Sequence, residues 1–239
     1  MDSLTNITGL VVLCRCEELI PFSILPMREI YPEVNLIVVD NSCGDICTKQ
    51  IEELAENDSG IQLIISKTNI GHGRGLLTGI KYVETPYVYI FDSDTGMIQR
   101  GLLEQMLEAI QPDKYGVGFS VWADKGGGTA TPWNVKKPRP KGAIKYMHPF
   151  CSLISMKRYN EFEPADSSFR TGNTCWGAPF ITMMNSLHDA GREDLLVDLP
   201  GLTYGGNIFV KHQKGGNRIL VSHKGPGPVK EEEFELEKF

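Results

Sequence analysis

Residues 87–95 have the sequence YVYIFDSDT, in which an apolar run ends in two carboxylates separated by one residue. Aromatic and β-branched residues favour a strand as far as Phe91. Side chains alternate along a strand, so we expect Asp92 and Asp94 on the same side. Paired carboxylates repel each other unless a cation lies between them, and hard oxygen ligands suit Mg²⁺ or Mn²⁺. The alternative is a simple turn, because Asp, Ser and Thr are common turn formers.

Three earlier apolar runs have the same character. They predict buried strands at Ile7–Leu13, Val34–Val39 and Ile61–Ile65. Helices are expected after them at 17–31, where two prolines limit or kink the helix, at 45–56 and at 71–83. Strands alternating with helices in this way are typical of a mostly parallel, doubly wound α/β sheet.

Polar residues follow each of the four predicted strands. In chain order they are Arg15, Asp40, Asn69, and Asp92 with Asp94. Ligands of doubly wound sheets bind beyond the carboxyl ends of the strands. The topology therefore predicts that these side chains gather around one ligand site.

The second half of the chain has a more mixed pattern. We expect helices at 102–110 and 176–190 and strands at 115–122, 147–156, 202–212 and 218–223. A long irregular segment, 123–145, contains a run of glycines and six basic residues, five of them at 136–145. We treat 1–239 as a single domain with two halves, 1–97 and 98–230, and an acidic tail, 231–239.

Composition limits the class of protein. The chain has 239 residues, 41% of them hydrophobic, which suits one large α/β domain. A net charge of −6 argues against nucleic-acid binding driven by total charge. The six cysteines show no zinc-ribbon spacing, and we expect reduced thiols. We find no signal peptide and no apolar run near the roughly 18–20 residues of a membrane span, so we expect a cytoplasmic protein.

Four motifs, in this order and spacing, resemble those of GT-A fold glycosyltransferases, closest to family 2. The first strand leads into Cys14-Arg15-Cys16-Glu17-Glu18, where that family often has Pro-Thr-Tyr-Asn-Glu. Val38-Val39-Asp40-Asn41-Ser42 and the glycine-rich Asn69-Ile70-Gly71-His72-Gly73-Arg74-Gly75 resemble the second and third motifs. Phe91-Asp92-Ser93-Asp94 resembles the metal-binding Asp-x-Asp. The resemblance is strongest over 8–100. It implies a Rossmann-like three-layer α/β/α sandwich with a mostly parallel central sheet and a smaller mixed C-terminal sheet.

The resemblance also implies a donor site. It predicts that Asp92 and Asp94 hold Mn²⁺ or Mg²⁺, which would bridge the diphosphate of a nucleotide-sugar donor, most simply a UDP-sugar. Asp40 would contact the base or ribose. The other donor contacts that we expect are Arg15, Asn69, Gly71, Arg74 and Lys224. For Arg74 an ordinary salt bridge is the alternative.

A third metal ligand is expected from the C-terminal half, because many enzymes of this fold supply a late histidine. We favour His223, which is followed by Lys224 and glycines; His212 is the competitor. A lone histidine is more often structural than a ligand.

The catalytic base is missing from its usual place. Inverting family members carry an acid in a stretch such as Trp/Phe-Gly-x-Glu-Asp, but here the stretch is Cys175-Trp176-Gly177-Ala178-Pro179. The base then lies elsewhere, at Asp124, Asp166 or Asp198, or the alignment is shifted, or a retaining mechanism lets the departing phosphate take the proton. Trp176 would stack on a sugar or pack in the core.

The basic segment suggests an acceptor contact. Lys136, Lys137 and Arg139 would favour an anionic hydroxyl acceptor: a glycan, a lipid-phosphate carrier or a modified base in DNA. A solvated loop is the simpler interpretation.

Two other functions compete with sugar transfer. A nucleotidyltransferase usually has a glycine-rich, basic signature after the first strand, and this chain lacks one. A non-catalytic nucleotide- or glycan-binding module is compatible with the missing acid.

Overall fold

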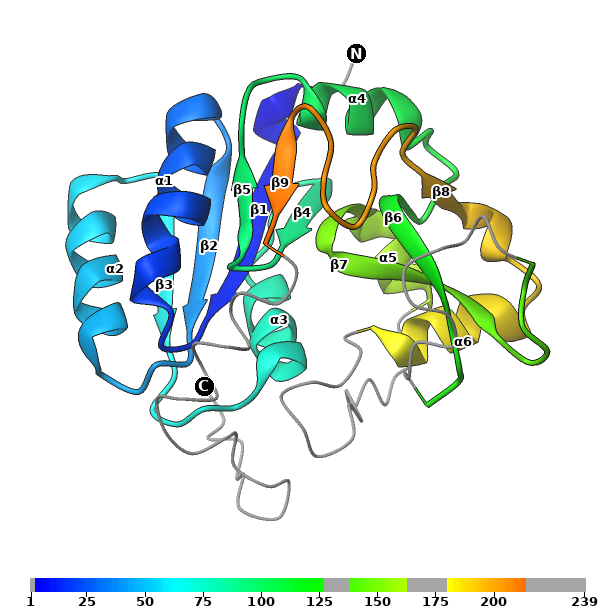
Figure 1. The fold of residues 1–239 in the computed structure, drawn as a ribbon, viewed down its shortest axis with the longest axis horizontal. Coiled ribbons are helices and arrows are strands. Elements are labelled where there is room, and N and C mark those ends of the chain that lie inside the picture. Colours follow the sequence, from blue (N-terminus) through cyan, green and yellow to red (C-terminus); the bar gives the residue numbers. More distant parts are fainter. Residues whose placement is uncertain (1–2, 127–137, 163–179, 214–239) are drawn as a thin grey trace.

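A seven-stranded sheet with the order β3-β2-β1-β4-β7-β6-β8 forms the centre of the molecule (Figure 1). The computed structural model describes residues 3–126, 138–162 and 180–213. Among the described strands of this sheet, β7 is antiparallel to both of its neighbours and the other pairings are parallel. The strands are β1 (Ile7–Leu13), β2 (Asn35–Asp40), β3 (Ile61–Ile65), β4 (Tyr87–Phe91), β6 (Gly116–Ala123), β7 (Ile144–Ser155) and β8 (Leu196–Asp198).

Helices pack against this sheet. Helix α3 lies on β1 and β2, α2 lies against β3, and α6 lies against β7. The α-helices are α1 (Ile20–Ile30), α2 (Ile46–Asn57), α3 (His72–Ile80), α4 (Leu102–Ala109), α5 (Met156–Phe162) and α6 (Ile181–Asp189). Short 3-10 turns are η1 (Leu4–Asn6), η2 (Glu17–Leu19) and η3 (Glu193–Leu195). None of the described helices has the length and hydropathy of a membrane-spanning segment.

A second, two-stranded sheet lies beside the main one. It pairs β5 (Thr95–Met97) with β9 (Val210–His212) in antiparallel fashion. The predicted fold class, a mostly parallel α/β sheet with a smaller second sheet, is confirmed. The small sheet is antiparallel, and its strand β5 begins directly after the paired aspartates.

The apolar runs form strands because both faces of the sheet are covered. Every residue of β1 is buried, as are all residues of β2 except Asn35. Such strands need continuous apolar sequence rather than alternation. Helix α3 approaches them closely through two glycines: a Cβ on Gly75 would lie 2.8 Å from Val12, and one on Gly79 would overlap Leu10.

The predicted elements differ from the observed ones mainly in the second half. The expected strand 202–212 is a hydrogen-bonded loop that becomes a strand only at Val210–His212. Strands β5 and β8 and helix α5 were not predicted. Helix α1 runs on past Pro26. The expected strand at 218–223 lies outside the described residues.

Candidate active site at the end of strand β4

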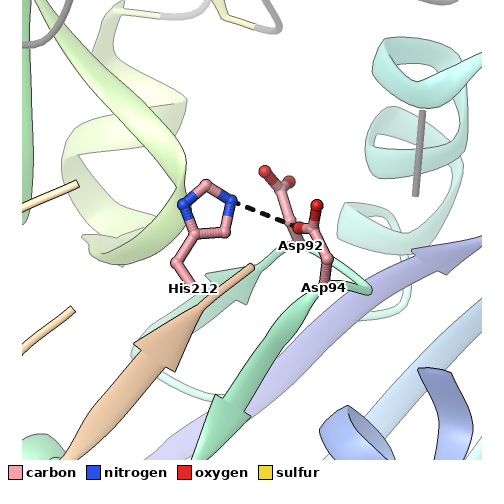
Figure 2. A group of neighbouring side chains, drawn as sticks. All are labelled: Asp92, Asp94 and His212. Atoms are coloured by element: carbon pink, nitrogen blue, oxygen red, sulfur yellow. Dashed lines mark ion pairs between the residues drawn. The ribbon is translucent and has the colours of Figure 1, made fainter. Parts of the chain in front are cut away.

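Asp92, Asp94 and His212 form one cluster of charged side chains (Figure 2). Each offers one ligand atom, and these atoms all lie within 4.8 Å of one another. Both aspartates follow β4 directly, and His212 is the last residue of β9. Thr95 pairs with His212 in the small sheet, and the Gln213 N–H donates to the Asp94 carbonyl at 2.9 Å. The small sheet therefore brings the histidine to the aspartates.

The ring of His212 is held on three sides. Its Nδ1–H donates to the carbonyl of Tyr204 at 2.7 Å. Phe150 stacks on the ring with centroids 4.5 Å apart, and the Tyr204 ring meets it edge-on at 4.5 Å. Because Nδ1 faces a carbonyl, which only accepts, Nε2 is left to face Asp94 Oδ1 at 3.2 Å.

The electrostatics of the cluster favour a positive charge. The side chains of His212 and Asp94 are 2% and 1% exposed. Burial lowers the pKa of His212, but the hydrogen bond to Asp94 and the charges of Asp94 and Asp92 outweigh it, so the pKa is raised. An unprotonated Nε2 beside a carboxylate oxygen would be repulsive. The cluster is thus stable with a proton on the ring or with a cation between the side chains.

The donor set fits a divalent cation. Two ligand atoms at roughly 2.1 Å from one ion, and at right angles, lie about 3 Å apart. His212 Nε2 and Asp94 Oδ1 are 3.2 Å apart. Two carboxylates suit Mg²⁺ or Mn²⁺, and the added imidazole favours a transition ion such as Mn²⁺.

The late histidine in this cluster is His212, which the sequence ranked second. The favoured candidate, His223, and the expected diphosphate contact Lys224 lie outside the described residues, so their roles stay predictions. His223 was favoured because Lys224 and glycines follow it, whereas the position of His212 depends on the pairing of β9 with β5, which no local pattern shows.

The other expected donor residues also lie at the carboxyl ends of the strands, but with partners of their own. Asp40 is fully buried; its carboxylate accepts from the Ser42 N–H at 2.8 Å and from the Thr48 hydroxyl. It therefore holds the turn after β2. A contact between Asp40 and a nucleotide stays a prediction.

Asn69 and Gly71 shape the turn that enters α3. Asn69 Oδ1 accepts from the Gly71 N–H at 3.0 Å, and Asn69 Nδ2 contacts Cys14 Sγ at 3.4 Å. Gly71 has φ +84°, which favours glycine, and its carbonyl accepts from Asn41 Nδ2 at 3.1 Å. Buried side chains thus fix this turn from both sides.

The two expected basic donor contacts come from different elements. Arg15 follows β1 with φ +50°; its N–H donates to Ser42 Oγ at 2.8 Å, and its Nε lies 4.0 Å from Asp45 Oδ2. Arg74 is half-buried in the first turn of α3. Arg15 therefore contacts the turn after β2, whereas Arg74 lies at the start of α3.

Arg139 is paired within the protein. Its guanidinium donates to both carboxylate oxygens of Glu193, at 2.8 and 3.0 Å, and stacks on Trp122 with 5.0 Å to the ring centroid. An anionic acceptor would have to compete with Glu193 for this charge. The other expected acceptor residues, Lys136, Lys137 and Trp176, lie outside the described residues.

The candidate bases differ in position. Asp124 follows β6, which is two strands from β4 in the sheet; Asp124 is exposed and accepts from the Gly126 N–H at 2.8 Å. Asp198 ends β8, three strands from β4, and pairs with Lys145 at 2.8 Å. Asp166 lies outside the described residues.

One neighbour of the cluster was not predicted. His72, the first residue of α3, has Nε2 3.4 Å from Asp92 Oδ1. The sequence had shown His72 only as a residue among glycines. Its position at the helix start, beyond a strand end, was the available signal.

The mostly parallel central sheet with covering helices and a small antiparallel sheet is the architecture of the GT-A fold. Residues 10–184 match the sequence model of glycosyl transferase family 2, and the chain belongs to this family. A Mycobacterium tuberculosis protein that carries a provisional glycosyltransferase name is 29% identical over 100 residues, which are 42% of this chain and 29% of the relative.

Two solved structures share the fold. Residues 1–349 of TarS from S. aureus align with a TM-score of 0.57 and 14% identity, covering 90% of this chain and 62% of that one. The mannosyltransferase PcManGT from Pyrobaculum calidifontis, solved with GDP-Man and Mn²⁺, aligns with a TM-score of 0.51 and 15% identity, covering 65% of this chain and 46% of that one. The chain thus spans less than two thirds of the length of each relative.

Proposed function

We propose that this protein is a divalent-metal-dependent glycosyltransferase that moves a sugar from a nucleotide-sugar donor to a hydroxyl acceptor. The observation that carries the proposal is the cluster of Asp92, Asp94 and His212 at the carboxyl end of β4. In an open α/β sheet this edge is where ligands bind. Family membership supplies the reaction class, and the cluster supplies the means of holding a charged donor.

The chain's own residues would act on the donor as follows. Asp92, Asp94 and His212 would hold Mn²⁺, which when bound neutralises the charge on the departing nucleoside diphosphate. The start of α3, with its N–H groups and Arg74, would face the same phosphates. Arg15, Asp40 and Asn69 would line the nucleotide side.

We also propose which nucleotide the donor carries and which ion the site binds. The mannosyltransferase with the same fold was solved with GDP-Man and Mn²⁺, which supports Mn²⁺ and a nucleotide sugar here. We propose a UDP-sugar as the first donor to test and a GDP-sugar as the second. We assign donor binding to residues 1–97, with His212 completing the metal site from the other half, and acceptor binding to 98–230.

We propose that the acceptor is a hydroxyl group on an anionic carrier. We propose Asp124 as the catalytic base. Asp124 follows a strand two places from β4, whereas Asp198 ends a strand three places away and is paired with Lys145. A base is expected to affect transfer by about 100-fold or more without being needed for donor binding.

The test is a binding panel followed by turnover. Thermal shift and calorimetry would use UDP, GDP, UDP-sugars and GDP-sugars, each with and without Mn²⁺. A ligand that binds the folded state raises the melting temperature. We expect a Mn²⁺-dependent shift that Asp92→Asn and Asp94→Asn abolish, while Asp113→Asn, an exposed acid beside Lys114, keeps it. Donor hydrolysis and transfer then separate an enzyme from a binding module, and Asp124→Asn should reduce transfer alone. A panel with no metal-dependent shift would sink the proposal.

A further inference from the structure

The carboxylate of Asp92 has neighbours on two sides. Asp94 and His212 lie on one side, in the cluster described above. On the other side His72 reaches it from α3, with Nε2 3.4 Å from Asp92 Oδ1. This contact is an ion pair, in which the imidazole edge of His72 faces the negative charge of the Asp92 carboxylate.

The turn before His72 is built to hold it in place. Gly71 has a backbone that favours glycine, and Asn69 and Asn41 bond its N–H and its carbonyl at 3.0 and 3.1 Å. Helix α3 then packs closely on β1 and β2 through Gly75 and Gly79. His72 therefore projects from a fixed point, and its side chain is 24% exposed.

We infer that His72 is a positioning residue for Asp92. It holds the Asp92 carboxylate from the start of α3 and so fixes the orientation of this carboxylate toward Asp94 and His212. Partners of this kind behind a metal ligand fix its orientation and often change metal affinity by about 10–100-fold. This inference rests on the proposed function, because it takes Asp92 to be a ligand.

The geometry separates His72 from the ligands themselves. The group of atoms within 4.8 Å of one another holds Asp92, Asp94 and His212 and leaves His72 out. His72 is thus placed behind Asp92 rather than beside the ion. His72 also connects the start of α3, which we expect to face the phosphates, with the expected metal site. This contact would fix the position of the metal site relative to the helix start.

The test measures Mn²⁺ affinity of the intact protein without any donor, by calorimetry and by electron paramagnetic resonance. We expect His72→Ala to weaken Mn²⁺ binding by about 10-fold or more. His72→Gln, whose amide can donate to the same oxygen, should restore most of the affinity. Thr78→Ala, on the same helix, serves as the control and should bind as the wild type does. Melting temperatures without metal should agree among all four proteins, which excludes a folding defect.

Pulsed paramagnetic resonance separates positioning from ligation. A ¹⁴N signal from His212 should persist in His72→Gln and disappear in His212→Ala. Loss of nitrogen coupling in His72→Gln would make His72 a ligand and overturn the inference, as would wild-type affinity in His72→Ala. Absence of Mn²⁺ binding to the wild-type protein would instead refute the proposed function, so the two failures are distinguishable.

Discussion

At the scale of single residues, the site depends on how each polar side chain is held before any ligand arrives. His212 has one ring nitrogen on a carbonyl and its ring between Phe150 and Tyr204. Asp92 and Asp94 lie in the turn after β4, in which the Thr95 N–H donates to the Asp92 carbonyl at 2.9 Å. This turn, rather than strand alternation, brings the two carboxylates together. Preorganised ligands lower the ordering cost of binding, which is the physical advantage of a buried cluster.

A residue far from the site gives a prediction about pH. The Arg28 guanidinium donates to both oxygens of Asp58, at 2.7 and 3.1 Å, and thereby lowers the pKa of Asp58 below its ordinary value of 3.8. A lowered folded-state pKa adds stability above pH 3.8, and this stability is lost as pH falls through the folded value. Because the Asp58 side chain is 34% exposed, we expect no more than about 1 kcal/mol.

The measurement is urea unfolding of Asp58→Asn and wild type. The variant should be less stable at pH 7, and the difference should shrink below pH 3.8. Asp113→Asn, whose carboxylate meets only the adjacent Lys114 among the ion pairs of the described residues, is the control. A difference independent of pH would show that the carboxylate charge is not the cause.

At the scale of elements, the close approach of α3 to the sheet determines how a substitution at Gly79 changes stability. A glycine in a helix interior ordinarily costs about 1 kcal/mol relative to alanine, so Gly79→Ala would stabilise an exposed helix. Here the added Cβ would overlap Leu10 and lie 3.0 Å from Val39, and both side chains are fully buried. Overpacking costs about 1–3 kcal/mol, which exceeds the gain.

We therefore expect Gly79→Ala to lower the melting temperature by several degrees, measured by circular dichroism. Thr78→Ala, at the preceding position of α3, should change stability by no more than about 0.5 kcal/mol. Equal or higher stability of Gly79→Ala would mean that α3 can move away from β1. The same variant should also disturb His72, which begins this helix.

The sequence predicted the elements of the first half because their signals are local. Buried parallel strands require continuous apolar runs, and β1, β3 and β4 begin and end at the predicted residues. Strand β5 has three residues that follow the two aspartates directly, where a turn pattern competes. Its existence depends on pairing with β9, and local patterns carry no record of such a distant partner.

The same reasoning explains the outcome at the site. Asp92 and Asp94 were predicted because both lie in one short motif. His212 was only a competitor and His72 was overlooked, since each meets the aspartates through the tertiary arrangement. Arg139 donates to Glu193, 54 residues away in the chain, a pairing that the sequence did not show, and its contact with an acceptor stays a prediction. Contacts between distant segments are what single-sequence reasoning does not supply.

At the scale of the whole molecule, the loop before β9 controls the cluster. Gly206 has φ +97°, and a Cβ there would overlap the carbonyl oxygen of Val210. Thr203 and Gly206 exchange two backbone hydrogen bonds, and the His212 N–H donates to the Gly205 carbonyl. A side chain at Gly206 must therefore displace β9, and His212 with it.

We expect Gly206→Ala to weaken Mn²⁺ binding by about 10-fold or more while the central sheet stays folded. Calorimetry and circular dichroism measure the two effects. Gly201→Ala is the matched control, because Gly201 also has a positive φ, +77°, but open space around the Cβ position. Unchanged affinity in Gly206→Ala would show that β9 does not need this loop conformation to deliver His212.

The pairing of β5 with β9 has one more consequence. Two ligands come from just after β4 and one from a strand made much later in the chain, so an ion held by all three would act as a removable crosslink between early and late segments. An ion that binds the native state and not the unfolded chain stabilises the native state by mass action. During synthesis, the ribosome must have released residue 212 before this crosslink can form. Metal binding would then require that the segment after β4 and strand β9 have both been synthesised and packed together.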